Sequence, residues 1–263
     1  MIKPTADDAL LVRKRDLKNN YYSITFKPFT SAKKCKPGHF IQLQIPKTDI
    51  FFRRPMSIAS VSSDGDIEVI FNVVGRGTKL LANLEKNDTV NILGPLGSSF
   101  SNPKKNEEVV IIAGGVGFPP LMYFATELVK SKFPAKQIHF FYGGRSKDDI
   151  LEKSRIKKLG LNFYPITEDG TFGEKGLVTK PVERFINENE KSKLRIYSCG
   201  PTGMLKAANE IGKKYNIPGE LSLEAPMPCG VGICLGCIVE LEKGGHARVC
   251  AEGPVFQIGE VKL

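Results

Sequence analysis

The chain of 263 residues has a formal net charge of +10, and 41% of its residues are hydrophobic. That length accommodates two modest domains and a small module, and the composition is typical of a globular protein. No apolar run reaches the roughly 18 residues of a membrane-spanning helix, so we expect no membrane association.

The lysines behind the positive charge are spread along the chain, and no basic run is interleaved with aromatic residues, so we expect no nucleic-acid partner. The first residues, MIKPTADDAL, lack the apolar core of a secretory signal, which indicates a cytoplasmic protein. Cytoplasmic thiols stay reduced, and this disfavours a disulfide framework for the six cysteines. One of them, Cys35, stands among lysines, and we expect it to be an incidental surface thiol.

Residues 1–103 are predicted to form an antiparallel β-barrel or sandwich. Their β-rich runs are broken by Pro, Gly, Asn and Asp, and they read YYSITFKPF (21–29), HFIQLQIP (39–46), DIEVIFNVV (66–74) and DTVNILGPLG (88–97).

Two short motifs in this part of the chain suit an anionic, ring-containing ligand. FFRRPMSIAS (51–60) combines Arg54 with an extended segment that Pro55 stiffens, and Ser57 follows; such a segment can hold a pyrophosphate and lie along a flat ring. In VVGRGTKLL (73–81) the glycines permit close backbone approach, and we expect Thr78 to open a helix whose amides meet a phosphate. Taken alone, each motif is also typical of a solvated strand edge or an ordinary strand-to-helix turn.

Residues 104–219 alternate between strand and helix patterns, which predicts a doubly wound parallel sheet with helices on both faces. One of the expected helices covers KDDILEKSRIKKLG (147–160). AGGVGFPP (113–120) is a glycine turn between the first parallel strand and its helix, where dinucleotide phosphates bind in such folds, although it is not a GxGxxG motif. Cys199 and Gly200, in YSCGPTGML, follow a later strand at the same ligand-binding edge.

Residues 220–263 carry four of the six cysteines. Cys229, Cys234, Cys237 and Cys250 have the spacing C-x4-C-x2-C-x12-C, which matches a plant-type [2Fe–2S] site. Gly230, Gly232 and Gly236 lie between them, as expected for a loop that turns tightly around a cluster. Zinc remains an alternative, although structural zinc usually shows two C-x2-C pairs and this chain has one.

In this order, the segments RPMS, GRGT, GGVG…PP and CGP resemble those of the ferredoxin–NADP reductase superfamily. The segments TEDGTFGEKGLVT, LEAPMPCGVGICLGC and RVCAEGPVFQIGEVKL are similar to those of the electron-transfer subunits of NAD-linked (class 1B) dihydroorotate dehydrogenase, and the similarity covers nearly the whole chain. The resemblance implies an FAD-binding β-barrel, an NAD-binding domain and a [2Fe–2S] module.

The resemblance also implies a role for individual residues. The residues implied to bind FAD are Arg54, Pro55, Met56, Ser57, Phe71, Asn72, Val73, Gly77 and Thr78. The residues implied to face the nicotinamide dinucleotide are Gly114, Gly115, Gly117, Cys199 and Gly200. The four cysteines 229, 234, 237 and 250 are implied to hold the cluster. Two positions depart from the family pattern, because Asn72 and Pro226 each stand where the family often has an arginine.

The implied function is electron transfer rather than substrate oxidation. Electrons from dihydroorotate pass from an FMN-containing catalytic subunit through the cluster and FAD to NAD⁺, in pyrimidine biosynthesis and in a heterotetramer of two plus two subunits. No catalytic residue is expected on this chain, since His39, His139 and His246 stand apart from one another. Arg145 and Ser146 lie where an adenosine ribose is sensed and tolerate a 2′-phosphate, so the choice of NAD over NADP rests on the resemblance.

Two alternatives stay open at this point. The first is a flavin and iron–sulfur subunit of another complex, of the sulfhydrogenase or the ferredoxin–NADP transhydrogenase type. The second is a zinc-stabilised nucleotide-binding protein without catalytic activity.

Overall fold

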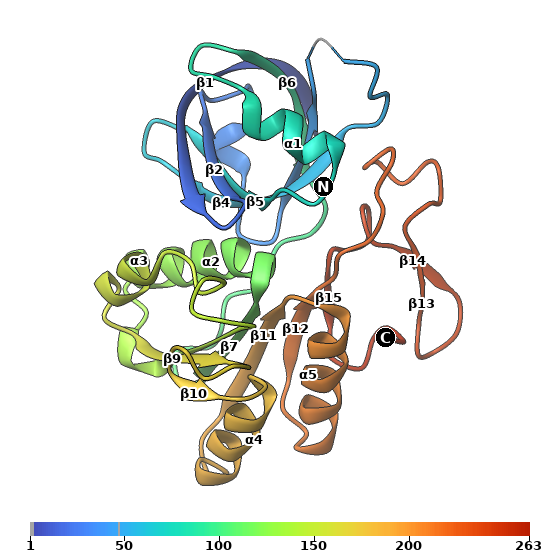
Figure 1. Ribbon diagram of the computed structural model, residues 1–263. Helices are drawn as coiled ribbons and strands as arrows, with labels where there is room; N and C mark the ends of the chain where they lie inside the picture. The colour runs from blue at the N-terminus through green and yellow to red at the C-terminus, as the bar shows by residue number, and fades with distance from the viewer. Residues whose placement is uncertain (1–2, 47) are drawn as a thin grey trace.

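The N-terminal part of the chain closes into an antiparallel β-barrel in the computed structural model, which describes residues 3–46 and 48–263 (Figure 1). The strands follow one another around the barrel in the order β1-β2-β5-β4-β3-β6. Their bounds are β1 (Thr5–Lys18), β2 (Tyr21–Phe26), β3 (Phe40–Gln44), β4 (Arg54–Val61), β5 (Ile67–Asn72) and β6 (Thr89–Leu96). The predicted barrel is confirmed. Strand β1 was not among the predicted runs, because Ala9 and Leu11 are its buried residues and the alternation is therefore faint.

Helix α1 (Arg76–Asn83) connects β5 to β6, and its buried residues Leu81 and Ala82 join the barrel core. The helix begins two residues earlier than predicted, after Gly75. Thr78 lies in its first turn, where the hydroxyl oxygen accepts hydrogen bonds from the backbone N–H of Val74 (2.9 Å) and Gly75 (3.2 Å). Thr78 therefore shapes the turn that enters the helix.

Beside the barrel lies a seven-stranded sheet with the strand order β10-β9-β8-β7-β11-β12-β15. The first six strands are parallel, and β15 runs antiparallel to β12. The bounds are β7 (Glu108–Gly114), β8 (Ile138–Gly144), β9 (Asn162–Thr167), β10 (Glu174–Lys175), β11 (Leu194–Cys199), β12 (Gly219–Ser222) and β15 (Val255–Gln257). The predicted parallel sheet is confirmed.

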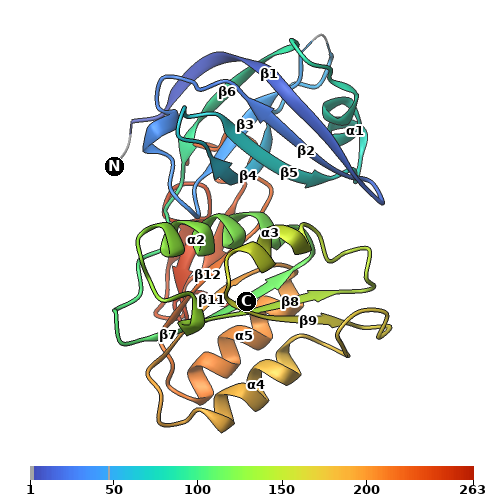
Figure 2. The same ribbon diagram turned by 90° about the vertical axis from the view of Figure 1, so that its left-hand side faces the viewer.

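Helices cover both faces of this sheet, as Figure 2 shows. The helix bounds are α2 (Phe118–Lys130), α3 (Lys153–Lys158), α4 (Thr179–Glu188) and α5 (Thr202–Lys214), with short 3₁₀ turns η1 (Ala32–Lys34), η2 (Gly115–Gly117) and η3 (Ala135–Gln137). Val109 and Ile111 of β7 belong to the same core as α2, whereas Val110 and Ile112 share a core with α4 and α5. The two buried faces explain why β7 reads as an uninterrupted apolar run.

Helix α2 packs between the barrel and the sheet (Figures 1 and 2). Its Tyr123 is buried in the barrel core, and the hydroxyl donates a hydrogen bond to the carbonyl oxygen of Cys35 at 3.2 Å. The expectation that Cys35 is a surface thiol was wrong. Its side chain lies inside the barrel, and burial raises the pKa of the thiol to about 12.

Helix α3 is shorter than the predicted helix over 147–160. The chain before it forms a turn in which the Asp149 carboxylate accepts a hydrogen bond from the backbone N–H of Arg145 at 3.0 Å. The Asp149 carboxylate also accepts a hydrogen bond from the hydroxyl of Tyr21 in the barrel. Asp side chains that bond to nearby backbone N–H groups compete with helix formation, and this turn therefore delays the start of α3.

The C-terminal tail leaves the sheet after β12, forms a loop over 228–237 and a small hairpin, and then returns to the sheet as β15 (Figure 1). The hairpin strands are β13 (Ile238–Glu240) and β14 (His246–Arg248). Because β12 spans the predicted boundary at 219/220, the division into modules 1–103, 104–219 and 220–263 stays a proposal.

A buried network of charges ties the barrel to α3. The Glu68 carboxylate accepts hydrogen bonds from Arg15 (2.7 Å) and from Arg155 of α3 (2.9 Å), and Arg15 also pairs with Glu152. Burial alone raises the pKa of Glu68, but Arg155, Ser23, Ser60 and Arg15 stabilise the carboxylate and bring its pKa to about 2. The network therefore helps to fix the barrel relative to the sheet that α3 covers.

We therefore expect Glu68→Gln to lower the free energy of unfolding in urea by about 3 kcal/mol at pH 7, because two partly buried arginines lose a buried counter-charge. An exposed control, Glu85→Gln, changes it by less than about 0.5 kcal/mol. Because the pKa of Glu68 is depressed, its contribution is present above the ordinary carboxyl pKa and is lost as the pH falls from about 4 towards 2. If the free energies of unfolding of wild type and Glu68→Gln do not converge as the pH falls over that range, this account is contradicted.

Candidate functional site

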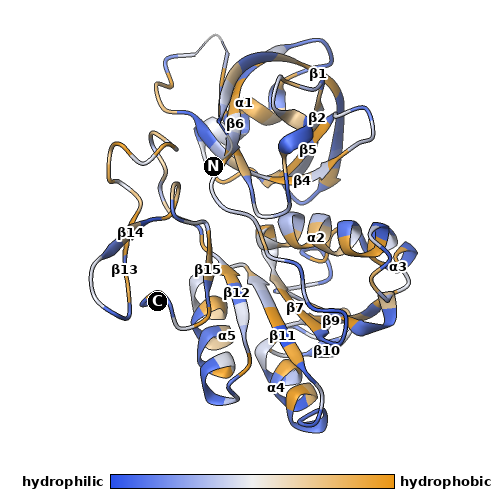
Figure 3. Cartoon of the chain, turned by 180° about the vertical axis from the view of Figure 1, so that it is seen from behind, coloured by the Kyte–Doolittle hydropathy of each residue, from blue (hydrophilic) through white to orange (hydrophobic). Residues whose placement is uncertain are grey.

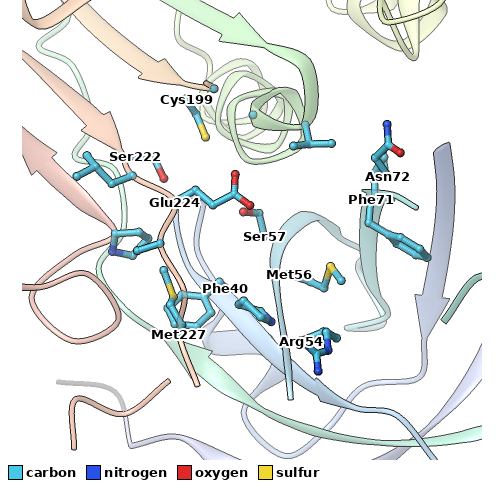
Figure 4. Close-up of a pocket in the computed structure, with 18 of the residues that line it drawn as sticks. Phe40, Arg54, Met56, Ser57, Phe71, Asn72, Cys199, Ser222, Glu224 and Met227 are labelled. Carbon is cyan, nitrogen blue, oxygen red and sulfur yellow. The ribbon is translucent and has the colours of Figure 1, made fainter. Parts of the chain in front are cut away.

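A cavity lies where the barrel, the sheet and the C-terminal tail meet (Figure 4). The predicted FAD residues that line it are Arg54, Pro55, Met56, Ser57, Phe71, Asn72 and Thr78, and the predicted nicotinamide residues that line it are Gly117, Cys199 and Gly200. Val73 and Gly77 do not line it, and Gly114 and Gly115 line a neighbouring cavity. Most residues of both predicted groups therefore meet at one place, although they come from opposite sides of α2.

Arg54 gives the barrel side of the cavity an unneutralised positive charge. One guanidinium nitrogen donates to the carbonyl oxygen of Phe52 at 3.1 Å, whereas Nε is buried without a partner within residues 3–46 and 48–263. A side chain at Gly77 would place its Cβ 2.7 Å from that Nε, so Gly77 leaves the guanidinium its room. A buried donor beside the first turn of α1 fits the pyrophosphate of a dinucleotide cofactor.

The other wall of this cavity is largely apolar. Phe40, Met56, Ile70 and Phe71 line it from the barrel strands, and Val116 lines it from the turn before α2. Ser57 contributes a hydroxyl in their midst, and Asn72 stands at the edge towards the second cavity (Figure 4). An apolar slot with a few polar groups suits the flat ring system of a flavin.

Sequence reasoning missed the residues that the tail adds to this cavity, namely Ser222, Leu223, Glu224, Ala225, Met227 and Pro254. Figure 4 shows the Glu224 carboxylate pointing into the cavity from the side opposite Met56. The local sequence pattern of this segment does not indicate that it returns to the barrel. That return depends on a tertiary contact, the hydrogen bond from Gln42 Nε2 to the Met227 carbonyl oxygen at 2.6 Å. Pro226 is exposed beside it.

The second cavity, of about 650 Å³, lies at the carboxyl ends of the parallel strands. Gly114 ends β7 and Gly115 follows it, Gly143 and Gly144 end β8, and Glu168 follows β9. Arg145 also lines this cavity, and Asp149 holds it through the backbone N–H and the side-chain Nε. Ser146 does not line it, so the predicted pair is only half placed. Glycines at strand ends let a phosphate chain approach the backbone.

Asn72, Val74 and Val116 line both cavities, and Gly117 and Cys199 lie beside them in the first cavity. Any side chain at Gly117 would overlap the carbonyl group of Cys199 and lie 2.5 Å from the backbone nitrogen of Gly200, so the turn before α2 packs directly on the end of β11. Burial raises the pKa of the Cys199 thiol to about 12, which keeps it neutral. A neutral thiol is a poor nucleophile.

The four tail cysteines lie together in two pairs. The Sγ atoms of Cys237 and Cys250 are 3.2 Å apart, and the backbone N–H of Cys234 is 3.5 Å from Sγ of Cys229. Backbone N–H groups point at the sulfurs, including Gly232 to Cys250 at 3.2 Å. Burial opposes ionisation of Cys229, but N–H donors from Cys234, Val231 and Ile233 outweigh it and lower its pKa to about 6.

The loop between the cysteines has the backbone that a cluster requires. Gly230 (φ +70°) and Gly232 (φ +78°) adopt left-handed conformations, as predicted for a tight wrap. Gly236 does not take a positive φ, which its neighbour Leu235 has instead (+59°), but the Gly236 N–H points at Sγ of Cys234 at 3.5 Å. The N–H groups so directed stabilise thiolates, which is the donor environment of an iron–sulfur cluster.

The pairing also bears on the metal. Within the parts of the chain that the structure describes, no three His, Cys, Asp or Glu side chains converge on one point as ligands of a single ion. A structural zinc site needs four ligands around one ion. In a two-iron cluster each iron takes two cysteines, and the pairs Cys229–Cys234 and Cys237–Cys250 fit that requirement.

The cysteine loop adjoins the first cavity. Met227 lines the cavity, and Cys229 is two residues further on, so their Cα atoms are at most about 7 Å apart. A group in the cavity and a group held by the cysteines are thus close neighbours.

Two parts of this chain match models of known protein families. Residues 111–210 match the family model of an oxidoreductase NAD-binding domain, and residues 224–262 match the iron–sulfur cluster binding domain of dihydroorotate dehydrogenase B. The electron transfer subunit of dihydroorotate dehydrogenase B (NAD⁺) from Desulforamulus reducens is 35% identical over 247 residues, which cover 92% of each chain. Its counterpart from Caldanaerobacter subterraneus is also 35% identical and covers 96% of this chain and 97% of its own.

This chain belongs to the family of dihydroorotate dehydrogenase B electron transfer subunits. The family relation confirms the resemblance drawn from the sequence, including an NAD-binding domain and an iron–sulfur module.

Solved structures support the fold of these family members. The NADH-dependent reduced ferredoxin–NADP oxidoreductase structure matches with a TM-score of 0.84 at 25% identity and covers 97% of this chain and 89% of that one. A ferredoxin–NADP⁺ reductase from Neisseria gonorrhoeae with bound FAD and NADP matches with a TM-score of 0.68 at 15% identity, covering 80% and 91%. The barrel-plus-sheet architecture is therefore that of ferredoxin–NADP reductases.

Across the described residues, no helix has both the length and the apolar character needed to span a bilayer.

The close packing at Gly117 gives a test of the contact between the turn before α2 and the end of β11. We expect Gly117→Ala to destabilise the chain by about 1–3 kcal/mol in thermal or urea unfolding and to weaken NADH binding several-fold, because the new methyl group forces β11 and the turn apart.

Gly203→Ala, whose Cβ would meet no atom within 4 Å, is the matched control and leaves the unfolding free energy unchanged or slightly raised. Equal stability of the two variants would show that the turn and β11 are not packed as described.

Proposed function

We propose that this chain carries electrons between NAD⁺ and a catalytic dihydroorotate dehydrogenase subunit by means of FAD and a [2Fe–2S] cluster. The observation that carries the proposal is the adjacency of three places: the NAD-binding edge of the sheet, the cavity shared with the barrel, and the two cysteine pairs, of which Cys229 is two residues beyond Met227. FAD supplies the link, since it exchanges single electrons with a cluster and a hydride with a nicotinamide.

On the barrel side, the residues proposed to hold FAD are those that fit its two ends. Arg54 and the first turn of α1 bind the pyrophosphate, with Thr78 fixing the turn and Gly77 giving the guanidinium its space. Pro55, Met56, Ser57, Phe71, Asn72 and Val73 are proposed to flank the rest of the cofactor. Asn72 is neutral where the family often has an arginine, so Arg54 is left as the main positive charge in this cavity.

On the sheet side, Gly114, Gly115 and Gly117 are proposed to bring backbone amides to the dinucleotide phosphates. Cys199 and Gly200 lie at the end of β11 and line the first cavity, where they are proposed to face the nicotinamide ring. The neutral thiol of Cys199 excludes water there without adding a charge.

In the tail, Cys229, Cys234, Cys237 and Cys250 are proposed to ligate the cluster. Their backbone N–H contacts favour the thiolate form that iron requires. The residues Val231, Ile233 and Leu235 of the same loop are exposed, Ile233 by 80%. Apolar side chains around the cysteines support contact with a partner at this loop, whose apolar segments Figure 3 also shows.

The partner is proposed to be an FMN-containing catalytic subunit, assembled with this chain as a heterotetramer of two plus two. The relatives' description as electron transfer subunits supports a catalytic partner. The histidines remain apart: His39 is buried, His139 bonds Glu108 and Tyr164, and His246 is exposed on the hairpin. The cytoplasmic location stays a prediction.

A second candidate is the corresponding subunit of a ferredoxin–NADP transhydrogenase. It is favoured by the structural match with a TM-score of 0.84, but the sequence identity there is 25% against 35% for the dihydroorotate dehydrogenase relatives. Co-purification from native lysate separates the two, because it recovers either a dihydroorotate-oxidising subunit or a large iron–sulfur subunit.

Cysteine variants test the proposal on the purified full-length chain. We expect Cys250→Ser to lose at least half of its iron and acid-labile sulfide and the [2Fe–2S] EPR signal, because one thiolate ligand is missing, while FAD stays bound.

The control Cys35→Ala, inside the barrel, keeps two irons and two sulfides per chain. If Cys250→Ser keeps a full cluster, or if wild type contains zinc and no sulfide, the assignment of the cysteines is wrong.

A further inference from the structure

Arg248 and Glu252 form an ion pair directly beside the cysteine loop. Arg248 ends β14 and precedes Cys250 by two residues. Its Nε lies 3.0 Å from one Glu252 carboxylate oxygen, a terminal nitrogen pairs with the other, and the Glu252 carboxylate also accepts the backbone N–H of Arg248 at 2.7 Å. The pair is held at three points, which is unusual for side chains that are 40% and 43% exposed.

The remaining donor of Arg248 reaches into the loop. Its other terminal nitrogen donates to the carbonyl oxygen of Gly232 at 2.9 Å. The N–H of the same residue, Gly232, donates to Sγ of Cys250 at 3.2 Å. Gly232 is therefore bound on both sides, by the guanidinium at its carbonyl and by a ligand sulfur at its amide.

Space at this point is tight, so the arrangement is specific. A Cβ on Gly232 would lie 3.0 Å from the Ala251 Cβ and 3.1 Å from the Arg248 guanidinium, and the φ of +78° also requires glycine. The guanidinium thus closes the loop against the segment that carries the fourth cysteine.

We propose that Arg248 is a positioning residue that sets the reduction potential of the cluster, and that Glu252 moderates it. The inference rests on the proposed ligation of the cluster by the four cysteines. Reduction adds one electron to the cluster, so a neighbouring positive charge and a well-aimed N–H···S hydrogen bond both favour the reduced form. Arg248 supplies the charge and aligns the Gly232 N–H, and the Glu252 carboxylate cancels part of the charge.

The two partners therefore act in opposite directions. Arg248→Gln removes the positive charge and loosens Gly232, which lowers the midpoint potential. Glu252→Gln leaves the guanidinium uncompensated, which raises it. Arg248→Lys keeps the charge but loses the planar fork, so its potential lies between those of wild type and Arg248→Gln.

The test is an EPR-monitored redox titration of the full-length chain, with iron and sulfide content measured on each sample. Glu240→Gln is the matched control. It removes the same charge from an exposed ion pair with Lys262. Glu240 lies on the hairpin two positions beyond Ile238, the residue that pairs with Arg248. Of the variants, we expect its midpoint potential to be nearest to that of wild type.

Opposite shifts in Arg248→Gln and Glu252→Gln support the proposal. Unchanged potentials, or shifts in the same direction, overturn it, since general loosening of the loop has one sign. If Arg248→Gln loses its cluster, Glu252→Gln decides by the direction of its shift. A wild-type chain without iron and sulfide would instead contradict the proposed function itself.

Discussion

The hydrogen bond from Gln42 to the Met227 carbonyl holds the cysteine loop next to the cavity that the barrel lines. Gln42 is fully buried in β3 of the barrel, and Met227 belongs to a tail that has just left the sheet. Gly230 packs on the same side chain, with a Cβ position 2.6 Å from Gln42 Nε2. This contact places the start of the cysteine loop against the barrel, so the cavity and the cysteines share one wall. The hydrogen bond therefore links the barrel directly to the segment that carries the first cysteine.

The other contacts keep that geometry stiff. The network around Glu68 locks the barrel to α3, and the hydroxyl of Tyr123 ties α2 to the strand-rich half. Strand β15 returns the tail to the sheet, where the backbone N–H of Leu223 donates to the carbonyl oxygen of Pro254 at 2.8 Å. Electron transfer benefits from such rigidity, because its partners then need no rearrangement between steps.

The sequence predicted the parts that local patterns specify. Four of the six barrel strands, the parallel strands that alternate with helices, the two glycine turns and the cysteine spacing each follow from a few neighbouring residues. The sequence did not predict what depends on distant contacts. Burial of Cys35 requires α2 against the barrel, the truncation of α3 requires Asp149 to bond Arg145 and Tyr21, and the entry of Glu224 into the cavity requires Gln42.

The central claim is that nicotinamide, flavin and cluster are connected within this one chain. An anaerobic titration of the purified chain with NADH, followed by flavin absorbance and by the EPR signal of the cluster, tests it most directly. The account predicts that stoichiometric NADH bleaches the flavin and makes the reduced cluster visible in the same titration. Flavin and cluster that are both present but unresponsive to NADH would contradict it, because the NAD-binding edge would then not be connected to the cavity.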